Sequence, residues 1–175
     1  MTWKSHKLLT LVLVWAFTHN VFYSFIASMG AIIPDFLEGK GFLYDYEKWM
    51  RTHRTYSHWF IPYAIIFLIS LLGMGKETFT LMKLDFLYFP SLSPGQGKVV
   101  LFFILSALSL GCLFHILEDA VSGKVPLWHP KKRTFGVRLI RTRSFLEYVF
   151  VFVIVVLVIA YKYMTYVEEG KRLWK

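Results

Sequence analysis

The sequence has little charge, few acidic residues and a single cysteine. Charged residues make up 18% of the 175 positions, and Asp and Glu together number 11. This composition excludes a soluble enzyme and a disordered, highly charged chain. One cysteine cannot form an internal disulfide, so a disulfide-stabilised secreted module is excluded as well. Because Cys112 lies within an apolar run, we interpret it as a small buried hydrophobic side chain.

Apolar and aromatic residues dominate the chain instead. Hydrophobic residues make up 56% of it and aromatic residues 19%, and the mean hydropathy is +0.50. Apolar runs of this kind are long enough to cross a hydrocarbon core of about 30 Å. The net charge is +9, which in this context matches anionic lipid headgroups better than nucleic acid. We therefore predict an integral membrane protein in contact with lipid, and we expect no nucleic-acid partner.

Four apolar segments predict four membrane-spanning helices, which end where charged residues resume. They cover residues 8–33, 59–74, 99–117 and 145–166. The first segment contains one polar interruption, Thr18-His19-Asn20, and we interpret it as a continuous span rather than a cleavable signal peptide. The predicted fold is all-α: a polytopic bundle of about four transmembrane helices that forms a single membrane domain over residues 1–175.

This topology divides the charged segments between two membrane faces. The N-terminus, residues 75–98 and the C-terminus share one face, and residues 34–58 and 118–144 share the other. The second face carries 11 Lys and Arg residues and the first carries 9. The positive-inside rule therefore favours, by a small margin, a cytoplasmic second face in the inner membrane of the cell.

Ionisable residues that suit metal binding gather on this second face. Placing an ionisable side chain at the middle of a membrane helix costs about 2.5–3.5 kcal/mol of insertion free energy, so such residues usually have a function. Asp35 ends the first span, His53 and His58 precede the second, and His115 and Asp119 share one side of the end of the third. These nitrogen and oxygen ligands suit one or two divalent ions, zinc above all. The alternative is that the carboxylates cap helices and the histidines hydrogen-bond headgroups or neighbouring helices.

Several residues beside these ligands have two possible roles each. Arg54 carries a planar guanidinium that suits a phosphate, or it forms a salt bridge with a neighbouring aspartate. Ser57 bonds a ligand or substrate, or it caps the second span. Glu118 points about 100° away from Asp119 and is expected to be a solvated neighbour or a partner of a ligand. Trp128 is expected at headgroup depth, and His129, which follows it, is a weaker candidate for an additional ligand.

The order of these motifs resembles a known family. It is the order seen in membrane-bound, metal-dependent hydrolases similar to the LexA-binding inner-membrane protein YdjM. The resemblance extends over residues 33–133 and implies a multi-pass membrane protein with a divalent-metal centre, distantly similar to the zinc-dependent phospholipase C and P1 nuclease group. The motifs that carry it are Ile33-Pro34-Asp35, the segment from His53 to His58, the segment from His115 to Asp119 and the segment from Gly123 to Pro130. The resemblance implies metal ligands at Asp35, His53, His58, His115 and Asp119.

The first motif of the family is incomplete in this sequence. It usually reads Leu-Pro-Asp-x-Asp-His, whereas Leu37 and Glu38 stand where the second Asp and the His are expected. One metal position is therefore lost, or it is rebuilt with Glu38.

The histidines near the N-terminus are left out of the predicted site. The family's N-terminal histidine corresponds to His6, which a straight helix over residues 8–33 would place about 40 Å from Asp35. His6 reaches the site only if residues 18–20 turn the chain back, and a bilayer allows this only where protein shields the turn. We expect His19 to hydrogen-bond between helices.

The sequence predicts a membrane-embedded hydrolase that cleaves a phosphate ester, either a phospholipid or a lipid-linked phosphate. Metal-activated water would attack phosphorus, with Arg54 and Asp119 as catalytic residues. Lipid phosphatases of the phosphatidic-acid phosphatase type 2 group are an alternative, but their Ser-Arg is missing because Leu110 follows Ser109. A further alternative is a non-enzymatic helical membrane protein with a structural metal or a partner-binding role.

Overall fold

Helices account for almost all of the regular structure in the computed structural model, which describes residues 1–39, 53–84, 87–90 and 95–173. The only strand pair within these residues is a short antiparallel one, β1 with β2. The elements in chain order are α1 (Trp3–Thr18), α2 (Val21–Gly30), α3 (Ile33–Leu37), the 3-10 helix η1 (Tyr56–His58), α6 (Phe60–Leu84), α7 (Gly97–Ser122), β1 (Val125–Pro126), β2 (Arg133–Phe135) and α8 (Phe145–Leu173).

Within the described residues, three helical segments are long and apolar enough to cross a membrane. They are Tyr56–Lys76, Gly97–Ser122 and Phe145–Glu168, and a shorter apolar segment covers Val21–Leu37. The predicted all-α polytopic membrane protein is thereby confirmed, and the last three spans lie where the sequence placed them. Gly75 has a φ of 79° inside α6, so the regular helix breaks where the sequence predicted the end of the second span.

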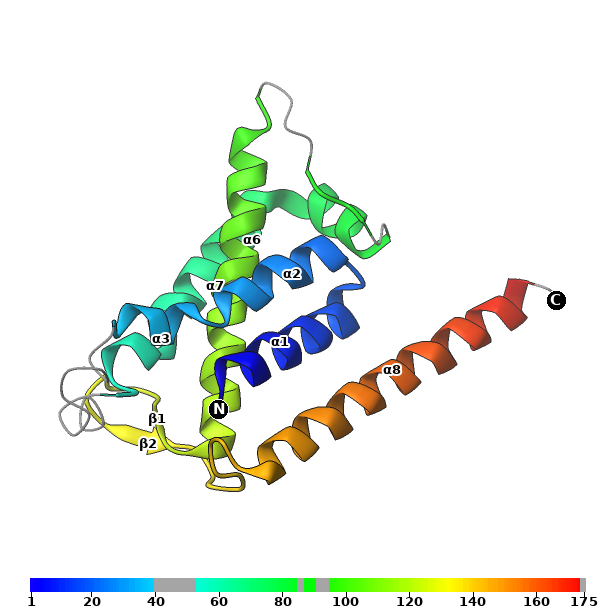
Figure 1. The fold of residues 1–175 in the computed structure, drawn as a ribbon. Coiled ribbons are helices and arrows are strands. Elements are labelled where there is room, and N and C mark those ends of the chain that lie inside the picture. Colours follow the sequence, from blue (N-terminus) through cyan, green and yellow to red (C-terminus); the bar gives the residue numbers. More distant parts are fainter. Residues whose placement is uncertain (40–52, 85–86, 91–94, 174–175) are drawn as a thin grey trace.

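The prediction of one continuous helix over residues 8–33 was wrong. Helix α1 ends at Thr18, and His19 follows in the left-handed conformation with a φ of 59°. Asn20 is the N-cap of α2, and its side chain accepts a hydrogen bond from the backbone N–H of Tyr23 at 2.8 Å. A capping side chain of this kind starts a new helix instead of continuing the old one. Helices α1 and α2 therefore form an antiparallel hairpin (Figure 1).

Protein groups satisfy the polar atoms of this turn. Asn20 is fully buried, and its side-chain amide donates to the Tyr88 carbonyl at 2.8 Å. The Thr18 hydroxyl donates to the Val14 carbonyl at 2.8 Å, and the Ser24 hydroxyl donates to the Asn20 carbonyl at 2.6 Å. A turn between apolar helices is stable at membrane depth only when its backbone is shielded in this way.

Helix α2 lies close against α7 because both contribute glycines to the contact. A Cβ atom on Gly111 would lie 1.9 Å from the carbonyl oxygen of Ala27, and one on Gly30 would lie 2.2 Å from that of Leu108. Small residues let helix backbones approach in this way inside membranes. The contact places α3, which follows α2 directly, beside the last turns of α7.

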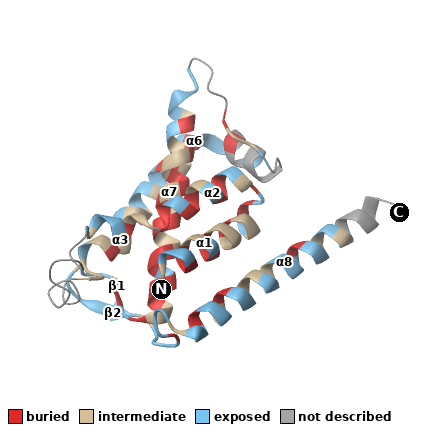
Figure 2. Cartoon of the chain, in the orientation of Figure 1, coloured by how far each residue is buried: buried red, intermediate tan, exposed pale blue. Residues whose placement is uncertain are grey.

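Helix α8 packs against α1, and hydrogen bonds fix its first turn to the start of the chain. The Glu147 carboxylate is buried and accepts hydrogen bonds from the Thr2 backbone N–H at 2.7 Å and the Ser5 hydroxyl at 2.6 Å. Beyond this turn most of α8 is exposed (Figure 2), and its exposed side chains are largely apolar, as expected of a helix that faces lipid. The start of α1 therefore lies at the same end of the molecule as the start of α8.

Candidate metal centre

Asp35 reaches the candidate site from the first turn of the short helix α3. Pro34 precedes it at the start of the helix, where a missing backbone N–H is tolerated. The indole N–H of Trp3 donates to Asp35 Oδ2 at 2.8 Å and fixes the orientation of the carboxylate. The other oxygen, Oδ1, is buried, makes no hydrogen bond to any described group, and faces two imidazole rings.

His58 ends η1, immediately before α6 begins, and its ring is fully buried. One ring nitrogen, Nδ1, lies 3.0 Å from Glu38 Oε1 and 2.9 Å from the Ser57 hydroxyl. The Ser57 hydroxyl donates to the same Glu38 oxygen at 2.6 Å. A carboxylate at Nδ1 favours the proton on that nitrogen and leaves the lone pair of Nε2 for a metal.

His115 and Asp119 project from the last two turns of α7. Their spacing of four residues places them on one side of the helix, with His115 Nε2 3.7 Å from Asp119 Oδ2. Both side chains are buried. The second oxygen of Asp119, Oδ1, accepts a hydrogen bond from the N-terminal ammonium group of Met1 at 2.6 Å.

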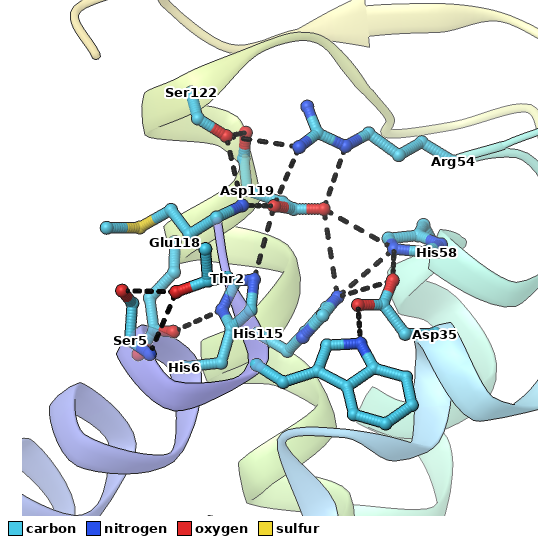
Figure 3. Close-up of polar contacts among 12 residues, drawn as sticks. Thr2, Ser5, His6, Asp35, Arg54, His58, His115, Glu118, Asp119 and Ser122 are labelled. Atoms are coloured by element: carbon cyan, nitrogen blue, oxygen red, sulfur yellow. Dashed lines mark hydrogen bonds and ion pairs between the residues drawn. The ribbon is translucent and has the colours of Figure 1, made fainter. Parts of the chain in front are cut away.

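Four ligand atoms from these elements converge on one point (Figure 3). His58 Nε2 lies 3.1 Å from His115 Nε2, 3.3 Å from Asp35 Oδ1 and 3.4 Å from Asp119 Oδ2, and His115 Nε2 lies 3.5 Å from Asp35 Oδ1. Tetrahedral coordination at about 2.0–2.1 Å needs neighbouring ligand atoms about 3.3–3.4 Å apart. Five of the six distances between these atoms lie between 3.1 and 3.7 Å, so the four residues, hereafter the four-ligand group, have donor types that suit a tetrahedral metal site and a spacing close to it.

A second ligand group shares Asp35 with the first. Its members are Asp35, Glu38 and His53, whose ligand atoms lie within 4.8 Å of one another. His53 Nδ1 lies 2.5 Å from Glu38 Oε2, so His53 is placed beside Glu38 and not in the four-ligand group with His58. Burial raises the pKa of Glu38, but hydrogen bonds to His53 and His58 outweigh it and hold that pKa well below its usual range.

Arg54 forms a salt bridge with Asp119, which is one of the two roles that the sequence analysis considered for it. Its Nη2 atom donates to Asp119 Oδ1 at 2.8 Å and to the Ser122 hydroxyl at 3.1 Å, and its Nε atom lies 2.8 Å from Asp119 Oδ2. A Cβ atom on Gly123 would lie 2.4 Å from Arg54 Nη1, so a larger residue there would displace the end of the arginine side chain. These contacts hold the positively charged guanidinium of Arg54 at the edge of the four-ligand group.

The straight helix that kept His6 away from the site is not formed, and the α1–α2 hairpin returns His6 to α7, beside the four-ligand group. Its Nδ1 atom lies 2.6 Å from Glu118 Oε2, its Nε2 atom lies 3.4 Å from Asp119 Oδ1, and its ring centroid lies 3.9 Å from that of His115. Glu118 also accepts from the Thr10 hydroxyl at 3.0 Å and is buried, so it is not a solvated neighbour. The polar interruption at residues 18–20 is the sequence signal from which the return of His6 to α7 could have been predicted.

Two histidines lie apart from both ligand groups. His129 is exposed, and its Nδ1 atom accepts a hydrogen bond from the Lys131 backbone N–H at 3.2 Å, so it shapes a turn. His19 lies at the far end of α1, in the turn before α2. Trp128, which precedes His129, is 74% exposed.

The chain was compared with known proteins by family and by individual sequence and structure. A family model described as YdjM inner membrane protein matches residues 1–170, which include every residue of both ligand groups. No curated protein and no solved structure matches the chain.

Proposed function

The chain belongs to the YdjM inner membrane protein family, and from this premise we propose that it is a membrane-embedded, metal-dependent hydrolase that cleaves a phosphate ester. The observation that carries the proposal is that Asp35 belongs to two adjacent ligand groups at once. A carboxylate shared between neighbouring sites is typical of hydrolases that use two metal ions. In this arrangement Glu38 rebuilds the metal position that the altered first motif puts in doubt.

Zinc is the metal that we expect at the four-ligand group. Two imidazole nitrogens and two carboxylate oxygens at nearly tetrahedral spacing suit this ion. When bound, it would supply a water of lowered pKa and would polarise a phosphoryl oxygen. His58 and His115 would hold it from two different helices, and Glu38 would keep the His58 ring in the required orientation.

Arg54 would bind the non-reacting oxygens of the phosphate. Its Nε and Nη2 atoms are already paired with Asp119, so Nη1 is the guanidinium nitrogen that would donate to the phosphate oxygens. A fixed cation beside the reacting group stabilises the charge that develops in the transition state. Asp119 therefore has two roles, because it faces the ligand group through Oδ2 and holds Arg54 through both oxygens.

A lipid-linked phosphate is the substrate class that the location favours. The four-ligand group lies where α7 ends and α6 begins, and both helices belong to membrane spans. Phosphate groups of lipids lie at the depth where such spans end. The hairpin supports a proposal for the orientation in the membrane, because it brings Lys4 and Lys7, predicted on the opposite face, to the basic residues of the site-bearing face. We propose that this face is cytoplasmic.

A structural metal site in a non-enzymatic protein is the second candidate. One observation favours it: the four-ligand group supplies a complete tetrahedral set from protein alone. Structural zinc sites are closed in this way, whereas catalytic sites keep one position for water or substrate.

Metal content and turnover measured together test the two candidates. Purified protein should contain a divalent ion, and it should cleave one member of a phospholipid panel until a chelator is added. His115→Ala and Asp119→Ala should lose both properties, whereas His129→Ala should keep them. Metal at full occupancy without chelator-sensitive turnover would assign the site to structure. Turnover that survives chelation would indicate a histidine nucleophile instead.

A further inference from the structure

The segment between α7 and α8, residues 124–144, combines two surface properties, and we name it the basic loop. It contains seven basic residues and no acidic residue. Exposed apolar side chains lie among them, at Trp128, Phe135, Val137 and Leu139. All seven basic residues are exposed: Lys124, Lys131, Lys132, Arg133, Arg138, Arg141 and Arg143.

The exposed apolar residues belong to a part of the loop that is fixed to the protein. The backbone N–H of Val137 donates to the Ala120 carbonyl at 2.7 Å, and that of Leu139 donates to the Val121 carbonyl at 3.0 Å. These bonds tie the loop to the last turn of α7. The side chains of Val137 and Leu139 nevertheless remain 55% and 71% exposed. The backbone thus holds apolar side chains outward at a fixed place.

We propose that the basic loop is a binding surface for anionic phospholipid headgroups. Both of its ends enter helices that are apolar enough to span a membrane, so the loop lies at the membrane surface. Basic residues attract anionic lipid there, and interleaved tryptophan and aliphatic side chains enter the boundary between headgroups and acyl chains. An acidic soluble partner would pair with the charges but would leave Trp128 and Leu139 without a role. This inference does not depend on the proposed hydrolase activity.

Lipid selectivity of the full chain tests the proposal. The protein is reconstituted into phosphatidylcholine vesicles that contain spin-labelled phosphatidylglycerol or spin-labelled phosphatidylcholine, and the motionally restricted fraction of each label is measured. We expect the restricted fraction to favour phosphatidylglycerol, and the preference to fall as salt rises. Arg138→Gln with Arg141→Gln should lower the preference about fivefold for each charge removed. Lys76→Gln with Lys98→Gln removes the same charge at the opposite end of the spans and should leave the preference unchanged.

Three results would overturn the proposal. The wild type would show no preference for phosphatidylglycerol, or both double variants would lose it equally. The third is salt-sensitive capture of soluble poly-glutamate without lipid selectivity, which would assign the basic loop to a protein partner. A second variant, Leu139→Ser, separates folding from binding: it should weaken retention of both labels while the thermal unfolding midpoint stays the same.

Discussion

His58 and His115 face each other through Nε2 atoms that lie 3.1 Å apart, although 57 positions separate them in the chain. Two imidazole nitrogens at this distance need a shared proton or a shared cation between them. The Nδ1 atoms on the other side of the two rings have different surroundings. That of His58 contacts Glu38, whereas His115 Nδ1 makes no hydrogen bond to any group in the described ranges. Glu38 is therefore the one carboxylate seen to orient a ring of this pair.

Replacing Glu38 should weaken metal binding without removing a ligand of the four-ligand group. Glu38→Gln keeps the size of the side chain but loses the charge that orients His58. Loss of such an orienting carboxylate lowers metal affinity roughly 10–100-fold. Competition with a metal-binding dye would measure the change. Glu168→Gln, at an exposed position of α8, is the matched control and should have no effect. Unaltered affinity in Glu38→Gln would remove Glu38 from the metal centre.

Replacing Asn20 should open the α1–α2 hairpin. Asn20→Ala removes the N-cap of α2, which costs about 1 kcal/mol, and leaves the partly buried Tyr88 carbonyl without this donor, which costs about 1 kcal/mol more. The free energy of unfolding in mixed micelles measures the sum. Asn20→Ser keeps a capping oxygen but cannot reach Tyr88 in the same way, so it should lie between the wild type and Asn20→Ala. Equal stability of all three proteins would contradict the shielded turn.

The sequence predicted the part of the site that depends on short-range geometry. His115 and Asp119 share a helix, and a spacing of four residues fixes their relative position whatever the rest of the fold does. Asp35 and His58 flank spans whose ends were readable from charge, so their convergence with α7 followed from topology. His6 could not be placed in the same way. Its position depends on a turn inside an apolar run, and hydropathy alone does not distinguish a broken helix from a continuous one.

Long-range packing accounts for the other departures from expectation. His53 was predicted to bind metal in one set with His58; the two ring centroids lie 5.3 Å apart, but Glu38 draws His53 into the second group through a contact that spacing could not reveal. Glu118 was expected to be a solvated neighbour or a partner of a ligand, because its direction differs from that of Asp119 by about 100°. Once α1 returns along α7, that direction points at His6 and Thr10 and not at solvent.

Adding a methyl group at Gly111 should separate α2 from α7 and thereby displace Asp35. The Cβ atom would meet a backbone carbonyl, which cannot move as a side chain can. Overpacking of this kind costs about 1–3 kcal/mol or more. We expect Gly111→Ala to lower both the free energy of unfolding and the metal content. Gly97→Ala, at the start of the same helix and with open space around it, should change neither. A fully metal-loaded Gly111→Ala protein would show that the α2–α7 contact does not position the site.

Arg54→Lys should separate the catalytic role of Arg54 from its structural one. Lysine keeps the positive charge beside Asp119, so metal content and thermal stability should stay close to those of the wild type. It loses the planar fork, and with it the Nη1 atom that would donate to the phosphate oxygens while Asp119 stays paired. Removing one donor to a developing negative charge lowers turnover by about 10²–10³-fold. The measurement is chelator-sensitive phosphate-ester cleavage, with Lys98→Arg on the opposite face as the control for a change of cation. If Arg54→Lys retained full turnover, Arg54 would be a structural partner of Asp119 alone, and the proposed phosphate clamp would have to be abandoned.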